Sequence, residues 1–190
     1  MIDSTVTKPA VLPPKGLLIA LAAQLPLLMT SLPLRPSTAE VVAGALLLAA
    51  GSVLNIWSER LFRRDNVGVC PFTRVPVLVT RGPYRVMRNP MYVGLVCLNL
   101  GVTFLSGVLA NLWSSVAYFI WLHYAFVLPE ERFLLHQLGG AFADYASHRP
   151  RWLGLRQFSV GEGSTKVEPY REGEFHHRRA RLQSRQGTEN

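Results

Sequence analysis

The chain has 190 residues, of which 49% are hydrophobic and 17% are charged, and its mean hydropathy is positive. This composition is too apolar, and the charges too unevenly placed, for an ordinary soluble domain. Basic loops on the cytoplasmic side of a membrane, attracted to anionic lipid headgroups, explain the net charge of +8 without a nucleic-acid partner. We therefore expect an integral membrane protein.

Two apolar segments follow a proline-containing N-terminal arm, residues 1–15. Residues 16–34 and 39–57 are each long enough to cross a bilayer core about 30 Å thick. The first segment loosely resembles a secretory signal. Its length, the interruption at Pro26 and the second span directly after it favour a retained membrane helix.

A long basic loop separates the second span from the third. Residues 58–88 contain seven arginines, and the stretch from Asn66 to Pro83 is rich in Gly and Pro, so it must turn repeatedly. A loop of this length is usually functional. Cys70 in the loop and Cys97 in the next span match no metal motif, and we expect neither a metal site nor a disulfide.

The next 41 residues, from Asn89 to Pro129, contain no Asp, Glu, Lys or Arg. This length suits two membrane helices, at about 90–108 and 111–128, joined by a tight turn. Arg88 precedes the first helix, and Glu130 with Glu131 follows the second. Such a hairpin brings the two charged ends to the same membrane face and builds a polar site there.

The positions of the basic residues predict the topology. They are abundant in the arm, in the long loop and after Pro129, and almost absent from the two remaining turns. We predict an all-α multi-pass bundle of about four spans, with both termini in the cytoplasm. Residues 131–154 are expected to form short helices on the cytoplasmic face, broken at Gly139–Gly140 and ending the membrane domain of residues 16–154. Residues 155–190 are polar and are expected to be disordered.

Asn89 and Pro90 form a strong helix start, since Asn is a favoured N-cap and Pro is tolerated at the first helical position. Asn89 is thus either a cap, a ligand contact, or both. A helix N-terminus also attracts anions. Tyr92 lies one turn inside the helix and on the same face, within reach of a ligand at the rim.

Other polar and small residues in the hairpin have simpler explanations. Asn99 and Thr103 are expected to form hydrogen bonds between helices, and Gly94 permits close helix packing. His123 lies seven residues before Glu130, on nearly the same helix face. It either bridges helices or serves as a base. The two glutamates form either a structural ion pair with Arg88 or part of a ligand site.

The segment GPYRVMRNPMYVG, residues 82–94, is followed 35 residues later by EERFL and then by an FxxY element and PRW. These ordered motifs resemble the isoprenylcysteine carboxyl methyltransferase and phospholipid methyltransferase superfamily over about residues 66–153. The resemblance implies a multi-pass membrane enzyme that binds S-adenosylmethionine without a Rossmann domain.

Carried over by position, the resemblance assigns one wall of the cofactor pocket to the first motif and the other to the glutamate pair. The implied cofactor-binding residues are Tyr84, Arg88, Asn89, Pro90, Tyr92, Gly94, Glu130 and Glu131. The implied catalytic candidates are Arg88, which would orient an anionic acceptor, and Glu130 or His123, which would act as base towards an amine. The family often has His where this chain has Asn89, so we assign no acid–base role there.

The sequence predicts a lipid or small lipophilic methyl acceptor and leaves open a carboxylate, a phospholipid amine or a thiol. It also leaves the oligomeric state open. The alternatives are a small four-span transporter or another non-catalytic membrane protein. A transporter is disfavoured because no ionisable residue lies deep in a span. An NADPH-dependent sterol-type reductase is disfavoured by the lack of a G-x-G-x-x-G pattern.

Overall fold

The computed structural model describes residues 12–32, 35–64 and 78–154. Expectations for most of the N-terminal arm, for the loop around Cys70 and for the tail lie outside these residues. The described part of the chain contains helices and no strand, which confirms the all-α prediction. The α-helices are α1 (Pro13–Ala22), α2 (Leu25–Thr30), α3 (Thr38–Arg64), α4 (Pro90–Ser106), α5 (Leu112–Leu122), α6 (Leu128–Leu138) and α7 (Gly140–His148).

The first apolar segment is two helices, α1 and α2, rather than one continuous span. The chain turns at Ala23 and Gln24 before α2 begins. Pro26 accounts for the break, because proline lacks an N–H and its ring crowds the carbonyl four residues earlier. The prediction of a single helix over residues 16–34 was therefore wrong in this respect.

The second apolar segment forms the long helix α3, which continues past the predicted membrane span of residues 39–57 to Arg64. Its start has a capping box. The Ser37 N–H donates to the Glu40 carboxylate at 2.6 Å, and the Glu40 N–H donates to the Ser37 hydroxyl at 3.3 Å. These reciprocal bonds satisfy two backbone donors at the helix start.

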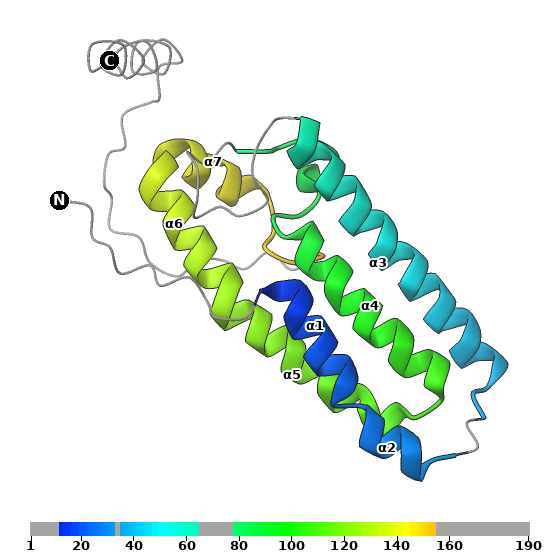
Figure 1. The fold of residues 1–190 in the computed structure, drawn as a ribbon. Coiled ribbons are helices and arrows are strands. Elements are labelled where there is room, and N and C mark those ends of the chain that lie inside the picture. The colour runs from blue at the N-terminus through cyan, green and yellow to red at the C-terminus, as the bar shows by residue number, and fades with distance from the viewer. Residues whose placement is uncertain (1–11, 33–34, 65–77, 155–190) are drawn as a thin grey trace, which may run out of the picture.

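Helices α3 and α4 lie side by side along their length (Figure 1). Glycines allow this close approach. A Cβ placed on Gly51 would lie 2.7 Å from the Gly94 carbonyl oxygen, and one placed on Gly44 would lie 2.9 Å from the Gly101 carbonyl oxygen. The two backbones therefore meet at two glycine pairs, as small residues permit in membrane helices.

Helices α4 and α5 form the predicted hairpin. Gly107 ends α4 in the left-handed conformation at φ +69°, and the short 3₁₀ helix Leu109–Asn111 leads into α5. A π-helical turn, His123–Val127, then joins α5 to α6 without a break. The segment after Glu130 therefore continues the second hairpin helix instead of starting a separate short one. By length and composition, Thr38–Arg64 and Leu109–Leu138 are candidate membrane spans.

A neutral polar cluster joins α1 and α2 to the hairpin. Gln24 donates to Asn99 Oδ1 at 3.3 Å and to Ser114 Oγ at 3.2 Å, and Thr103 donates to Gln24 Oε1 at 3.3 Å. Gln24, Asn99 and Thr103 are fully buried. This neutral cluster consists of Gln24, Asn99, Thr103, Ser114 and Ser115, and it supports the interhelical bonding expected for Asn99 and Thr103.

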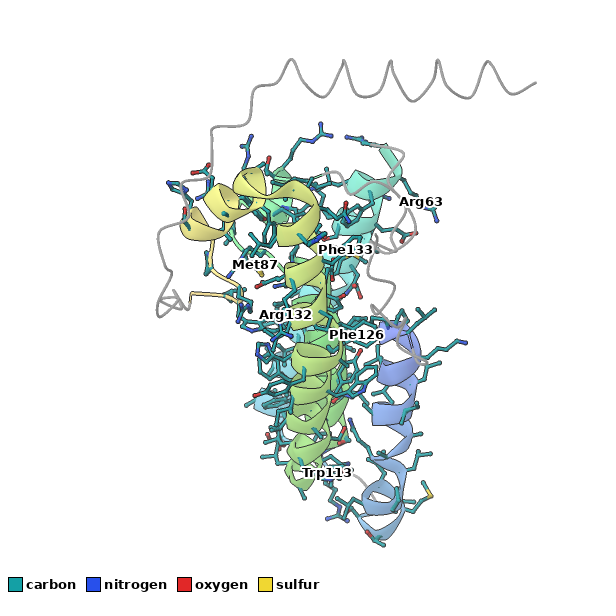
Figure 2. All side chains as sticks on the ribbon, turned by 90° about the vertical axis from the view of Figure 1, so that its left-hand side faces the viewer. Arg63, Met87, Trp113, Phe126, Arg132 and Phe133 are labelled. Atoms are coloured by element: carbon teal, nitrogen blue, oxygen red, sulfur yellow. The ribbon has the colours of Figure 1, made fainter. Side chains whose placement is uncertain are left out.

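Helix α7 packs against α6 at the end of the bundle away from the hairpin turn (Figure 1). Figure 2 shows Met87 and Arg63 towards this end and Trp113 towards the opposite one. After α7, residues 149–154 run back to the start of α4, where the Arg88 N–H donates to the Pro150 carbonyl at 2.9 Å. A segment distant in sequence thus lies against the start of α4.

Candidate functional site

Asn89 occupies the N-cap position of α4, but its side chain makes no capping hydrogen bond. The side-chain amide instead donates to the Arg151 carbonyl at 3.1 Å and approaches Glu131 Oε1 at 3.4 Å. The residue is 7% exposed. Of the two roles the sequence left open, the cap is absent, and Asn89 points across the hairpin.

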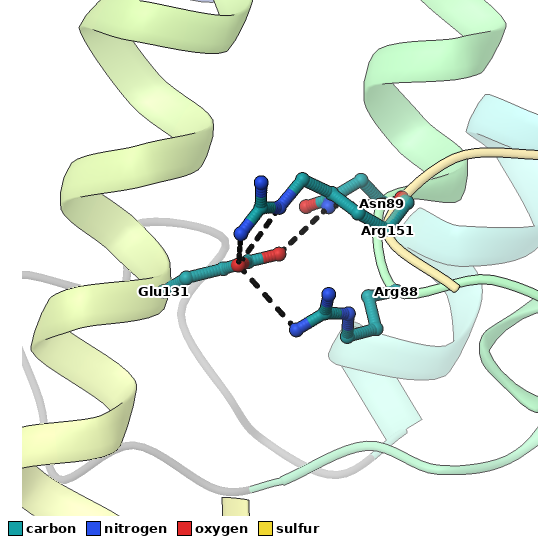
Figure 3. Close-up of polar contacts among 4 residues, drawn as sticks. All are labelled: Arg88, Asn89, Glu131 and Arg151. Carbon is teal, nitrogen blue, oxygen red and sulfur yellow. Dashed lines mark hydrogen bonds and ion pairs between the residues drawn. The ribbon is translucent and has the colours of Figure 1, made fainter. Parts of the chain in front are cut away.

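Glu131 lies at the centre of the charged ends (Figure 3). Arg151 donates to Glu131 Oε2 through Nε at 2.9 Å and through Nη2 at 2.7 Å. Arg88 Nη1 lies 3.4 Å from the same oxygen. The side chains of Arg88 and Glu131 are only 12% and 11% exposed. We call Arg88, Asn89, Glu131 and Arg151 the charged cluster.

The charge balance of this cluster is uneven, because two guanidinium groups share one carboxylate. Burial lowers the pKa of Arg88, Glu131 opposes that shift, and the nearby cation of Arg151 adds to it. Arg88 Nε is buried and has no hydrogen-bond partner among the described residues. Because buried polar groups are normally paired, an anion beside Arg88 would complete its hydrogen bonding.

Glu130, the residue before Glu131 on α6, is held by a hydrogen bond from α4. The Tyr92 hydroxyl donates to Glu130 Oε2 at 2.7 Å, which links the first turn of α4 to the first turn of α6. The Tyr92 ring also lies 6.3 Å from the ring of Phe126, centre to centre. The structure therefore brings together Arg88, Asn89, Tyr92, Glu130 and Glu131, as the hairpin predicts.

Two further predicted pocket residues lie around this group in packing positions. Pro90 is buried as the first residue of α4. Tyr84 packs with Leu61 and Val79, and its carbonyl accepts the Tyr145 hydroxyl at 2.8 Å. Burial raises the pKa of Tyr145 to about 12, so that hydroxyl remains a donor at neutral pH. Contact of Tyr84 or Pro90 with a cofactor stays a prediction.

Gly94 faces α3 rather than the charged cluster. A Cβ at this position would collide with the side-chain amide of Asn55 and would lie 2.9 Å from the Gly51 carbonyl. Its lack of a side chain is thus explained by helix packing alone. A cofactor contact through the Gly94 backbone stays a prediction.

His123 is the first residue of the π-helical turn. Its ring centre lies 6.4 Å from that of Phe119 and 5.9 Å from that of Trp152. Its Nδ1 is buried and has no partner among the described residues. His123 therefore contacts Trp152, which follows Arg151 in the sequence. Among the described residues, no hydrogen bond or ion pair joins His123 to Glu131 or Arg88. Helical π-turns are frequent at functional sites.

Arg151 is the site residue that sequence reasoning missed. It stands in PRW, which was noted only as part of a motif series. Nothing local distinguishes it from the other basic residues near the C-terminus, because its partners lie 20 and 62 residues away. Only the position of its motif after the helices hinted at a role.

A family model for phospholipid methyltransferases matches residues 39–140, more than half of the chain. The chain belongs to the phospholipid methyltransferase family. The matched segment runs from α3 to the start of α7 and contains the first motif and both glutamates of this family member, while Arg151 lies beyond it. A search of curated proteins and a search of solved structures gave no match. Family membership and the two long apolar helices together indicate an integral membrane methyltransferase.

Proposed function

We propose that this phospholipid methyltransferase family member is a membrane enzyme that uses S-adenosylmethionine to methylate a lipid or small lipophilic acceptor. One observation carries the proposal: Arg88, Asn89 and Tyr92 meet Glu130 and Glu131 at one end of the hairpin. These are the residues that the family resemblance assigns to the cofactor. The proposal also includes about four spans and cytoplasmic termini, as the distribution of basic residues predicts.

The residues present fit this cofactor. Its amino-acid end carries a carboxylate and an ammonium group, so it needs a cationic donor beside an acceptor. Arg88 Nε is a buried donor with no partner among the described residues. Glu131 Oε1 has one contact within the described chain, the 3.4 Å approach of Asn89. A cationic donor and an anionic acceptor therefore stand side by side with bonding capacity left.

The cofactor supplies a methyl group activated on a sulfonium. In the proposed site, Arg88 would bind its carboxylate, with the N-terminus of α4 adding favourable backbone dipoles. Glu131 would accept from its ammonium group. Glu130, already bonded to Tyr92, would accept from a hydroxyl or help to orient the acceptor.

The acceptor is proposed to be a lipid, in keeping with the family, with its reactive group an amine, a carboxylate or a thiol. An amine acceptor would need to lose a proton, and His123 or Glu130 would receive it. An anionic acceptor would instead be oriented by Arg88, competing with the cofactor carboxylate for the same donor. His123→Ala tests one of these two bases: an unchanged methylation rate removes His123 from the mechanism.

The direct test is calorimetric binding of S-adenosylmethionine and S-adenosylhomocysteine to the purified chain, in detergent and in lipid. The matched variant is Glu130→Ala/Glu131→Ala, with folding of both proteins checked by thermal melts. Binding by wild type that is lost in the folded variant supports the cofactor and its site. A well-folded wild type that binds neither compound, in lipid as well as detergent, would refute the proposal.

A further inference from the structure

We propose that Arg151 is a positioning residue of the cofactor site: it holds Glu131 through Oε2, which keeps Arg88 available for an anion and Glu131 Oε1 available for a cation. This inference rests on the proposed function. It adds a residue outside the segment matched by the family model and assigns it a role different from that of Arg88.

Arg151 and Arg88 differ in the number and length of their contacts with Glu131. Arg151 makes two short bonds to one oxygen, from Nε at 2.9 Å and Nη2 at 2.7 Å. Arg88 makes one long contact of 3.4 Å to the same oxygen. Two short charge-assisted hydrogen bonds fix the orientation of a carboxylate, whereas an ion pair at 3.4 Å attracts it without the same directional constraint. Arg151 therefore decides where the Glu131 side chain points.

This orientation of Glu131 leaves one of its oxygens and one nitrogen of Arg88 without a strong partner among the described residues. Glu131 Oε2 accepts two hydrogen bonds from Arg151 and lies in an ion pair with Arg88, and Oε1 receives only the 3.4 Å approach of the Asn89 amide among the described residues. Arg88 is 12% exposed, and its Nε has no partner in the described part of the chain. Without Arg151, the nearest strong partner for Glu131 would be Arg88. A close pair of those two would occupy the groups proposed to bind the cofactor.

The third step is how Arg151 is itself held in place. The Asn89 amide donates to the Arg151 carbonyl at 3.1 Å, and the Arg88 N–H donates to the preceding carbonyl of Pro150 at 2.9 Å. Trp152 is 7% exposed and its ring centre lies 4.8 Å from that of Phe119 on α5. The segment 150–152 is thus fixed to both hairpin helices, so the Arg151 side chain starts from a defined position.

The test uses the full chain in lipid nanodiscs and two probes. S-adenosylhomocysteine carries the amino-acid end, and 5′-deoxy-5′-methylthioadenosine has the same adenosine and thioether but lacks it. We expect Arg151→Gln to weaken S-adenosylhomocysteine binding at least tenfold and methylthioadenosine binding less than twofold. Arg151→Lys, which keeps the charge but not the paired geometry, should fall between wild type and Arg151→Gln.

A matched control and a double variant complete the design. Arg149→Gln removes a neighbouring arginine whose guanidinium donates to the adjacent His148 carbonyl at 3.4 Å, and it should leave both affinities unchanged. Because Arg151 acts through Glu131, Glu131→Gln/Arg151→Gln should bind S-adenosylhomocysteine no more weakly than Glu131→Gln alone. This double-mutant cycle tests whether Arg151 acts through Glu131 even if methylthioadenosine binds too weakly to measure.

The outcomes separate the two proposals. Equal loss of both probes in Arg151→Gln, unchanged S-adenosylhomocysteine binding, or additive losses in the double variant would overturn the positioning role while leaving the proposed function standing. Should Arg151→Gln fail to fold, Arg151→Lys is judged by the same probe ratio and the same cycle. A folded wild type that binds neither probe would overturn the proposed function, and this inference with it.

Discussion

The two buried polar groups of this protein, the neutral cluster and the charged cluster, each contain a buried N–H donor without a partner among the described residues, but they differ in charge. In the neutral cluster, Gln24 and Asn99 are fully buried and connected by several hydrogen bonds among uncharged amides and hydroxyls, although Asn99 Nδ2 has no partner among the described residues. In the charged cluster, two arginines share one carboxylate and Arg88 Nε has no partner among the described residues. Neutral groups of this kind connect helices, whereas an uneven set of charges indicates a place for a ligand.

The comparison predicts its largest effect at Glu131. Glu131→Gln keeps the shape but removes the charge that pairs with Arg88 and Arg151. Truncating one member of a buried charge pair costs about 2–5 kcal/mol. We expect S-adenosylhomocysteine affinity to fall by about a hundredfold, measured by calorimetry. A folded Glu131→Gln protein that binds as wild type does would show the charged cluster to be purely structural.

The next effect concerns the glycine pairs between α3 and α4. Gly51→Ala and Gly94→Ala each place a Cβ within 3 Å of the facing helix backbone. Overpacking of this kind costs about 1–3 kcal/mol, so both variants should melt at lower temperature. If Gly94 serves packing alone, S-adenosylhomocysteine affinity should be unchanged in both. A loss of affinity confined to Gly94→Ala would show instead that Gly94 contacts the cofactor.

A smaller effect is expected in the neutral cluster. Gln24→Ala leaves the side chains of Asn99 and Thr103 without their shared partner, at a cost of about 1–2 kcal/mol. The melting temperature should fall while cofactor affinity stays the same, the reverse of the Glu131→Gln result. Met29→Ala, at an exposed position on α2, is the control and should change neither quantity. A loss of cofactor affinity in Gln24→Ala would remove the distinction between the clusters.

The smallest effect is expected at Tyr145, which lies beside the charged cluster but outside it. Tyr145→Phe removes a single hydrogen bond of 2.8 Å to the Tyr84 carbonyl, worth about 1 kcal/mol. A slight decrease in melting temperature is expected, with cofactor affinity reduced less than twofold. A larger affinity loss would mean that the loop around Tyr84 belongs to the cofactor site, as the family resemblance implies.

The sequence predicted a large part of this architecture. The stretch of 41 residues without charge set the length of the hairpin, and its two ends then had to meet, which placed Arg88 near Glu131. Asn89–Pro90 marked the start of α4 correctly. These inferences succeed because helix length, turn position and helix starts depend on residues close together in the chain.

Tertiary structure decided the rest. The pairing of Arg151 with Glu131, the direction of Gly94 towards α3 and the burial of Gln24 among Asn99 and its neighbours all join residues from distant segments. No local pattern encodes such partners. The sequence around an arginine, a glycine or a glutamine does not show whether that residue faces solvent, lipid or another helix. The chain by itself thus determined the hairpin and which charged ends meet, and only helix packing determined which side chains complete the site.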